Sequence, residues 1–268
     1  MSHPGNHVPD ISEWMGWWTF DPLVLAGLAT AVGLYTAGML RMPRPQPTRA
    51  IAFYAGILTC ALALLSPIDR ASDVLFSAHM VQHELLMLVA APLVVLAKPY
   101  ATILWALPDR ARPHVRFTRT WNTLTVPAVA LGLHAAARIA WHVPALFDAA
   151  LADERIHAVQ HLTFFVTAVL FWSSLAYGRY GRFGYGVGVA FVFCTMLYTG
   201  LLAAVLTLGQ HALYAHAGPT LRWGLDPVED QQRAGLLMWV PAAVVMTSIG
   251  LAIFAAWLGQ AERAAERE

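Results

Sequence analysis

Lysine is almost absent from this chain, and charged residues of either sign are scarce. Only Lys98 accompanies the arginines, and charged residues make up 12% of the 268 residues, whereas a soluble domain contains about 25%. The formal net charge of +1 implies no general attraction to nucleic acid. Hydrophobic residues reach 58%. An ordinary soluble domain is therefore excluded, and membrane lipid is the expected surrounding.

Cysteine is scarce as well, and the start of the chain lacks basic residues. Cys60 and Cys194 both lie inside apolar runs, where a disulfide needs two touching helices, so buried, unreactive thiols are expected. Residues 1–20 contain neither Lys nor Arg and are not expected to be a secretory signal. With His3 and His7, they are predicted to form an outer N-terminal arm.

Seven apolar runs are long enough to cross a bilayer, which needs about 20 residues. They predict an all-α polytopic membrane protein with one transmembrane domain over 21–258 and a cytoplasmic tail over 259–268. Proline-containing segments separate several of the runs. The predicted spans are 21–40, 50–67, 73–97, 122–141, 156–177, 185–208 and 231–258.

Basic residues are distributed unequally between the two sides of these spans. An excess of basic residues marks cytoplasmic loops, so the N-terminus is predicted outside and the C-terminus inside. The predicted inner side holds twelve: Arg41, Arg44, Arg49, Lys98, Arg110, Arg112, Arg116, Arg119, Arg179, Arg182, Arg263 and Arg267. The predicted outer side holds five: Arg70, Arg138, Arg155, Arg222 and Arg233.

Two motifs of the form His-x-Val-Gln-His lie near the outer ends of spans three and five. They comprise His79 with His83, and His157 with His161. Histidines at i and i+4 project from one face of a helix, and both spans run inward, so the two pairs can face each other at a similar depth. Because such side chains are costly in lipid and usually functional, we predict a metal site. Histidines that only bond between helices are the alternative.

Further candidates lie at the same level of the membrane. His142, at the end of span four, is expected to be a metal ligand at the rim of the site. Asp226 and Glu229 are expected to cap the seventh helix. For Met80 packing is the alternative, and for the glutamines of the two motifs it is a bond between helices. Supporting roles are expected for Met80, Gln82, Gln160, Asp230 and Gln231.

Several short segments follow one another in a recognisable order over residues 20–258. They are Ser66–Asp69, His79–His83, Ala91–Leu96, Lys98-Pro99, Trp141–Pro144, His157–His161 and Asp230–Trp239. Together they resemble the multi-spanning CtaG family of cytochrome c oxidase assembly factors. The resemblance implies a bacterial inner-membrane protein that is not an enzyme. It would mature a haem-copper oxidase of the caa3 type by helping copper reach its buried site. The implied partners are the oxidase subunit that carries the copper centre and other copper chaperones.

The residues alone leave the metal open, because imidazoles suit copper, zinc, iron and nickel. One alternative is a haem held between His83 and His161. A second is a di-metal oxidoreductase that uses Glu84 and Asp230, and a third is a metal-free membrane scaffold. Glu84 also departs from the family pattern, in which an apolar residue usually follows the histidine. An ionisable side chain at this depth needs a partner, and Arg138 is one candidate.

Overall fold

The computed structural model describes residues 14, 16–108, 118–177, 184–214, 220–221 and 223–265. Within these ranges the chain is all-helical and has no strand, as predicted. The elements are α1 (Pro22–Arg41), α2 (Pro47–Leu65), α3 (Pro67–Ser72), α4 (Phe76–Glu84), η2 (Leu85–Ala90), α5 (Ala91–Ala97), α6 (Pro99–Leu104), α7 (Thr118–Leu124), α8 (Pro127–Trp141), α9 (Pro144–Ala152), α10 (Glu154–Tyr177), α11 (Gly184–Leu208) and α13 (Pro227–Ala265).

Some residues used in the sequence argument lie outside this part of the chain. They are His3, His7, Arg110, Arg112, Arg116, Arg179, Arg182, Arg222 and Arg267. The site predicted from the two histidine motifs lies entirely within the described ranges.

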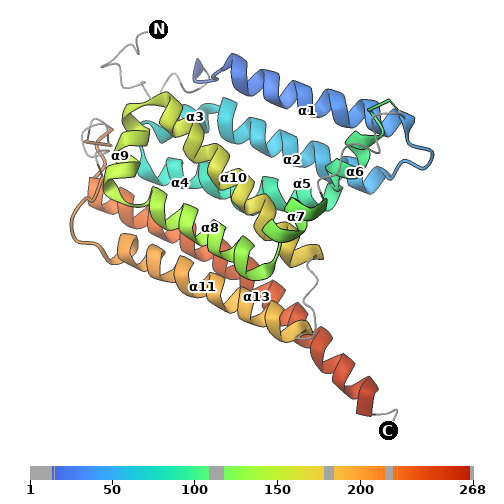
Figure 1. Cartoon of the computed structure of the whole chain (residues 1–268). Helices are drawn as coiled ribbons and strands as arrows, with labels where there is room; N and C mark the ends of the chain where they lie inside the picture. The colour runs from blue at the N-terminus through green and yellow to red at the C-terminus, as the bar shows by residue number, and fades with distance from the viewer. Residues whose placement is uncertain are drawn as a thin grey trace.

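The helices form a bundle in which the third predicted span is central (Figure 1). This span is one continuous helix made of α4, η2 and α5. Helix α2 packs against η2 and α5 on one side, and α13 packs against α4 on the other. Helix α10 packs against η2, α5 and α8, and α11 packs along α13, whose last turns project beyond the bundle. The first histidine motif is therefore carried by one of the two most enclosed spans, and α10, which carries the second motif, is the other.

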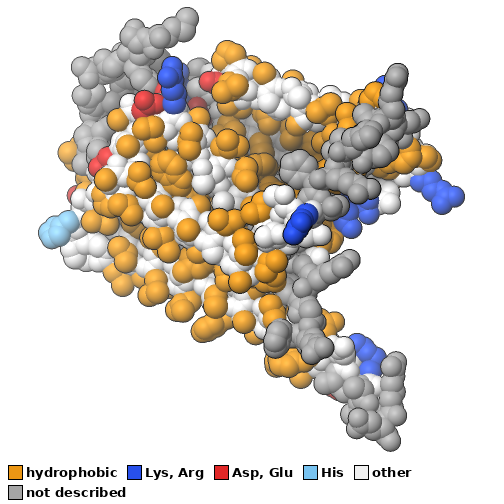
Figure 2. All heavy atoms as spheres, viewed as in Figure 1, with side chains coloured by type: hydrophobic (Ala, Val, Ile, Leu, Met, Phe, Trp, Pro, Cys, Tyr) orange, Lys and Arg blue, Asp and Glu red, His pale blue; other side chains and the backbone are white. Residues whose placement is uncertain are grey.

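The surface of the bundle fits a hydrocarbon environment. Six helices in the described ranges are long and apolar enough to cross a membrane: Pro22–Arg41, Pro47–Leu65, Phe76–Ala97, Glu154–Tyr177, Gly184–Leu208 and Pro227–Gln260. Figure 2 shows hydrophobic side chains over the middle of the visible face, with charged side chains toward its ends. Such a broad apolar surface is not found on soluble monomers. The protein is a multi-spanning membrane protein.

The predicted fourth span, 122–141, is not a single helix. Helix α7 ends at Leu124, and α8 begins at Pro127 and has only 15 residues. Val126 is extended (φ −59°, ψ 133°), because the ring of a following proline disfavours the helical conformation. Proline also occupies the first position of α1, α2, α3, α6, α9 and α13, where its missing N–H costs nothing.

A π-helical segment, η2, interrupts the central span just after the first histidine motif. Its last bond runs from Ala91 N–H to the carbonyl of Leu86, five residues back. The next bond in this register would join residue 92 to Met87, but Pro92 has no N–H to donate. The indole Nε1 of Trp172 on α10 donates to the Met87 carbonyl instead, at 2.8 Å. This bond joins α10 to the central span, and these are the two spans that carry the histidine motifs.

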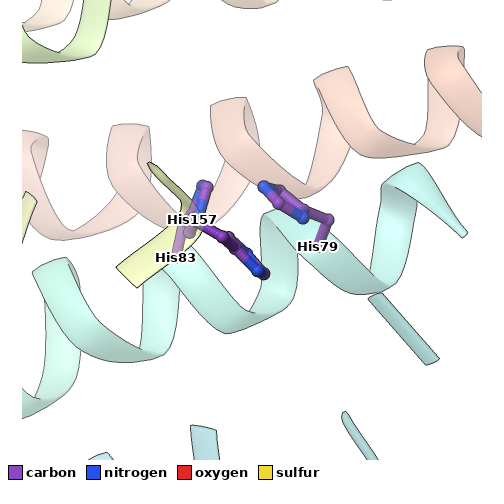
Figure 3. Close-up of side chains that lie close together, drawn as sticks. All are labelled: His79, His83 and His157. Carbon is purple, nitrogen blue, oxygen red and sulfur yellow. The ribbon is translucent and has the colours of Figure 1, made fainter. Parts of the chain in front are cut away.

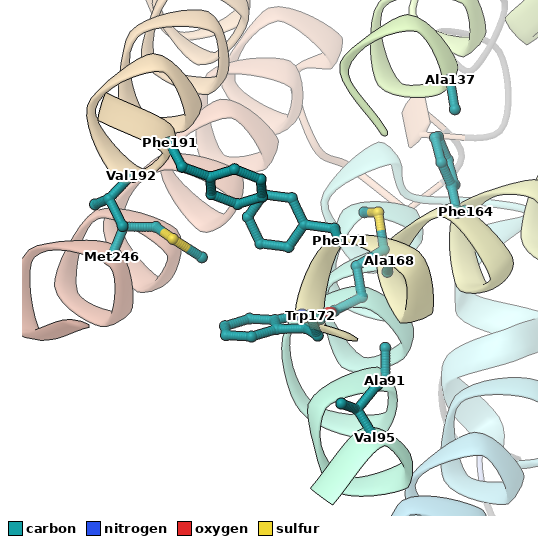
Figure 4. Close-up of a cluster of buried hydrophobic side chains, with 11 residues drawn as sticks. Ala91, Val95, Ala137, Phe164, Ala168, Phe171, Trp172, Phe191, Val192 and Met246 are labelled. Atoms are coloured by element: carbon teal, nitrogen blue, oxygen red, sulfur yellow. Dashed lines mark hydrogen bonds between the residues drawn. The ribbon is translucent and has the colours of Figure 1, made fainter. Parts of the chain in front are cut away.

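The largest apolar core lies on the same side of the central span, between α5, α8, α10, α11 and α13 (Figure 4). The rings of Phe171 and Phe191 pack with centroids 4.7 Å apart. Where α11 packs against α13, residue 235 must be glycine, because a Cβ there would clash with the side chain and the backbone nitrogen of Thr207 on α11. Small residues let membrane helices approach this closely.

Both cysteines are free, but only one has the predicted burial. Cys60 on α2 is buried, as expected. Cys194 on α11 is exposed, which corrects the expectation of a buried thiol. An apolar run gives no sign of which helix face meets the protein and which meets the lipid, because both faces are apolar.

Candidate metal centre

Four histidine side chains converge between α4 and α10. Within each helix the two rings lie one turn apart, with centroids separated by 4.2 Å for His79–His83 and by 4.2 Å for His157–His161. Between the helices, the centroids are 5.2 Å apart for His79–His157 and 5.1 Å apart for His83–His161. The i, i+4 spacing of both motifs thus produces the facing pairs that it predicts. We call these four residues the histidine cluster.

Three members of the cluster already approach the geometry of a metal site. Ring nitrogens of His79, His83 and His157 all lie within 4.8 Å of one another, and the three side chains point toward one another in Figure 3. Histidine bonds to zinc are about 2.0–2.1 Å long, so two ligands of an ion of this kind lie at most about 4 Å apart. The rings therefore need to move inward by less than about 1 Å to share one ion.

The two histidines on α4 are more deeply buried than the two on α10. His79 is 0% exposed and His83 is 1% exposed, whereas His157 and His161 are half-buried. The rings of Phe147 and Phe164 form apolar walls, 5.0 Å from His79 and 4.7 Å from His83 between centroids. An ion would therefore be shielded on the α4 side and accessible past α10.

His83 and His161 carry hydrogen-bonding capacity that the described residues do not use. Neither ring nitrogen of His83 has a hydrogen-bond partner in this part of the chain, and Nε2 of His161 also has none. A buried polar group left without a partner costs about 1–3 kcal/mol. Histidines kept only to hold helices together would be hydrogen-bonded, so this arrangement favours a ligand role.

His142 lies beside the cluster without joining it. His142 is the residue that follows the end of α8, and its Nδ1 lies 2.7 Å from the carbonyl oxygen of Arg138. Phe164 is a neighbour of both, because its ring centroid lies 4.7 Å from that of His83 and 6.5 Å from that of His142. His142 therefore lies near the cluster, beside an aromatic side chain that packs on His83.

Asp230 supports the cluster through the backbone of α4. Its Oδ2 accepts a hydrogen bond from Phe76 N at 2.7 Å, and its Oδ1 accepts from Ser77 N at 3.3 Å and from the Ser77 hydroxyl. The side chain before the helix, Leu75, cannot cap it, so a carboxylate from α13 does so. Asp230 thus fixes the start of the helix that carries His79 and His83.

The glutamines and Met80 occupy different positions. Gln231 Oε1 accepts from Leu213 N at 2.8 Å and so holds the segment before α13. Gln82 Nε2 donates to the Ala63 carbonyl at 2.9 Å and to Asp69 Oδ1 at 2.8 Å, which is the interhelical alternative. Gln160 is fully buried, and neither its Oε1 nor its Nε2 has a partner in the described ranges. Met80 packs into an apolar cluster with Phe76, Phe147 and Met238.

The two acidic residues that were predicted to cap α13 have different partners. Asp226 caps α13, because its Oδ1 accepts from Val228 N and Glu229 N at 2.8 and 3.0 Å. Glu229 instead forms an exposed ion pair with Arg233 at 3.0 Å.

Glu84 has the partner that its position demands. Its Oε1 accepts from Arg138 Nη2 at 2.9 Å, and the two side chains are 10% and 5% exposed. Arg138 Nη1 also reaches Met87 Sδ at 3.8 Å. The pair borders a cavity of about 20 Å³ with room for a water molecule, which His134 and Tyr198 also line. The predicted pairing of Glu84 with Arg138 is confirmed.

Comparison with known proteins assigns the chain to a family. Residues 33–260 match the model of the cytochrome c oxidase caa3 assembly factors, Caa3_CtaG. The chain belongs to this family. The resemblance carried by the histidine motifs and their neighbouring segments is thereby confirmed.

Curated relatives occur in mycobacteria. Uncharacterized proteins of Mycobacterium bovis and Mycobacterium tuberculosis are each 25% identical over 279 residues, and one of Mycobacterium leprae is 24% identical. The alignments cover 97% of this chain but only 42% of each relative, so the chain spans about two-fifths of the length of these proteins. No solved structure matches the chain significantly.

Sequence reasoning missed the aromatic walls of the site. Phe164 lies three residues after His161 and therefore on the same helix face, so its position in the sequence could have revealed it. Phe147 comes from α9, a short helix after α8, and nothing in the sequence places it against His79.

Proposed function

We propose that the histidine cluster carries a copper ion as cargo during assembly of cytochrome c oxidase. The observation that carries this proposal is the convergence of four imidazoles from two helices, with nitrogens of three of them within 4.8 Å. Membership in the assembly-factor family supplies the process. The chain would bind and release the ion without catalysing a reaction.

The chemistry of the ligands supports copper and supports release. Among divalent first-row metals, copper binds nitrogen ligands most tightly. The described cluster contains no thiolate and no carboxylate, so an ion is held by neutral ligands alone. The half-buried rings of His157 and His161 give the ion a way out on the α10 side. The proposed acceptor is the oxidase subunit that carries the copper centre, and other copper chaperones are proposed donors.

The proposed topology places this exit on the outer side of a bacterial inner membrane. We propose seven crossings, in which α7 and α8 together form the fourth, with the N-terminus outside. The distribution of basic residues supports this orientation. The cluster would then lie in the outer leaflet, close to the water from which copper arrives.

The alternatives fit the geometry less well. A haem between His83 and His161 would have to fit its plane between rings whose centroids are 5.1 Å apart, while His79 and His157 already occupy the adjoining space. A di-metal oxidoreductase needs carboxylate ligands, but Glu84 is paired with Arg138 and Asp230 caps α4. A scaffold accounts for the fold but leaves the unused nitrogens of His83 unexplained.

Metal analysis of the detergent-purified full chain tests the proposal. We expect copper to stay bound after dialysis, and a variant with all four cluster histidines replaced by alanine should lose it. His134 is the matched control, because it is also a buried histidine but lies outside the cluster. Its Nδ1 lies within hydrogen-bond distance, 3.2 Å, of Thr167 Oγ1. His134→Gln should keep the copper. Equal copper in the fourfold variant and the wild type would contradict the proposal, and a Soret band would point to haem.

A further inference from the structure

A small cavity lies inside the bundle where the central span meets α8, α10, α11 and α13. None of the four cluster histidines is on its wall, so the cavity is separate from the candidate metal centre. Its volume is about 20 Å³, and a water molecule needs at least about 10–15 Å³ of such space. The cavity therefore accommodates one water molecule and little else.

Three side chains on the cavity wall keep a hydrogen-bonding atom without a partner in the described ranges. These atoms are Oε2 of Glu84, Nε of Arg138 and the hydroxyl oxygen of Tyr198. Glu84 and Arg138 are 8% and 4% exposed, and they bond to each other through Oε1 and Nη2 at 2.9 Å. Each member of this buried ion pair therefore retains an unused atom, which costs free energy unless another group binds it.

Other hydrogen-bonding side chains on the wall are engaged elsewhere. Nδ1 of His134 lies 3.2 Å from Thr167 Oγ1, and the indole of Trp172 donates to a backbone carbonyl. The hydroxyls of Thr195 and Thr199 donate to carbonyls of their own helix at 2.8 and 2.7 Å. A hydroxyl has a single hydrogen, so the two threonine oxygens can still accept a bond but have none to donate. The wall therefore presents unused donors and acceptors together.

We infer that this cavity is a binding site for one water molecule, which joins Tyr198 of α11 to the Glu84–Arg138 ion pair. The donors and acceptors match those of water. The water accepts from Nε–H of Arg138 and from the Tyr198 hydroxyl, and it donates to Oε2 of Glu84. Its second hydrogen is donated to the oxygen of Thr195 or Thr199. Buried waters make about 2–4 hydrogen bonds, so this site would hold its water firmly.

The ion pair also determines the class of ligand. A cation in the cavity would be repelled by the Arg138 guanidinium, and an anion would be repelled by the Glu84 carboxylate, with little solvent to screen either charge. A larger neutral molecule does not fit in about 20 Å³. Apolar cavities stay dry, whereas polar ones hold water. The bound water would connect α11 with α4 and α8 whether or not the histidine cluster holds a metal.

Radiolytic hydroxyl-radical labelling of the full-length protein in detergent tests this inference, because X-rays convert a bound water into a radical that oxidises the side chains around it. Met87 lines the cavity. Met80 is the internal reference, because it lies on the same span, is similarly buried (1% exposed, against 3% for Met87) and packs in an apolar cluster. Mass spectrometry should show that Met87 is oxidised several-fold faster than Met80.

Two substitutions should remove the water in different ways. Tyr198→Phe deletes one of its hydrogen-bond partners, and Ala242→Val adds methyl groups at the cavity wall and fills the space. In both variants the oxidation rate of Met87 should fall toward that of Met80. Tyr54→Phe is the matched control, because the Tyr54 hydroxyl lies 2.8 Å from Thr36 Oγ1 and not on the cavity wall. This variant should leave the oxidation of Met87 unchanged.

Equal oxidation of Met87 and Met80 in the wild type would overturn the inference, because the cavity would then be dry. Undiminished oxidation of Met87 in Tyr198→Phe would also overturn it, since the label would not depend on the proposed partner. If Ala242→Val does not fold, Tyr198→Phe alone decides. Copper binding is not measured in this experiment, so the inference and the proposed function can fail independently.

Discussion

Replacing His83 by alanine separates a ligand role from a packing role. The ring is 1% exposed, lies 4.2 Å from His79 and 5.1 Å from His161 between centroids, and has no hydrogen-bond partner in the described ranges. Loss of a residue that only supports a ligand usually costs about 10–100-fold in metal affinity. Loss of a central ligand should cost more, so we expect His83→Ala to weaken copper binding by more than about 100-fold.

The same substitution should have a modest effect on folding. Truncation of a large buried side chain typically costs about 2–5 kcal/mol. Removal of a buried polar group that lacks a partner returns about 1–3 kcal/mol. The balance is a loss of about 1–2 kcal/mol, so the melting temperature of the metal-free variant should lie only a few degrees below that of the metal-free wild type.

Two measurements on the same preparations decide the matter. Chelator competition gives the copper affinity, and thermal unfolding in detergent gives the stability of the metal-free proteins. His211→Ala is the surface control, because His211 is exposed and lies outside the cluster. Wild-type copper affinity in His83→Ala would refute the ligand role. A large loss of metal-free stability would instead show that the ring is mainly a packing element.

Three further predictions follow from the supports of the site and from the topology. Asp230→Asn should weaken copper binding by about 10–100-fold, whereas Asp226→Asn, at the exposed cap of α13, should not, as chelator competition will show. Burial raises the pKa of Asp69, so protonation favours the folded state, and stability should fall as the pH rises through that raised pKa; Asp69→Asn should flatten this part of the profile in thermal unfolding. Reporter fusions in the loop between α6 and α7 and in the loop between α11 and α13 should report opposite sides of the membrane, and a shared side would refute the proposed topology.

The helices and the pairing of the histidines could be predicted because local rules determine them. Apolar runs define the spans, prolines define many of the helix starts, and the i, i+4 spacing places each histidine pair on one face. When two parallel spans carry the same motif at the same depth, the histidine pairs avoid lipid if they face each other. The partner of Glu84 could be named in advance, because a buried carboxylate needs a cation and Arg138 lies at a similar depth.

The contacts of the supporting side chains could not be predicted, because they depend on which helices become neighbours. Asp230 was expected to support the site, but its contact with the start of α4, which bridges 153–154 residues, could not be foreseen. The aromatic neighbour of His142, Phe164, could not be foreseen either. The break at Pro127 was missed for a different reason: its effect on the helix is local, but hydropathy continues across it. Hydropathy and periodicity contain no information on the order of helices around the bundle.

Some buried polar groups of this bundle are fully hydrogen-bonded, and others have atoms without a partner in the described ranges. Asp230 and Gln231 are hydrogen-bonded and hold the start of α4 and the segment before α13 in place. Atoms without a partner in the described ranges belong to Gln160, Glu84 and Tyr198 as well as to His83 and His161, but the histidine rings are the ones that converge on one another. A scaffold would use its buried histidines as it uses its carboxylates, to satisfy the backbone of neighbouring helices. Because each uncompensated polar group in a membrane protein is costly, the copper ion that we propose would offset this cost by binding several of these nitrogens together.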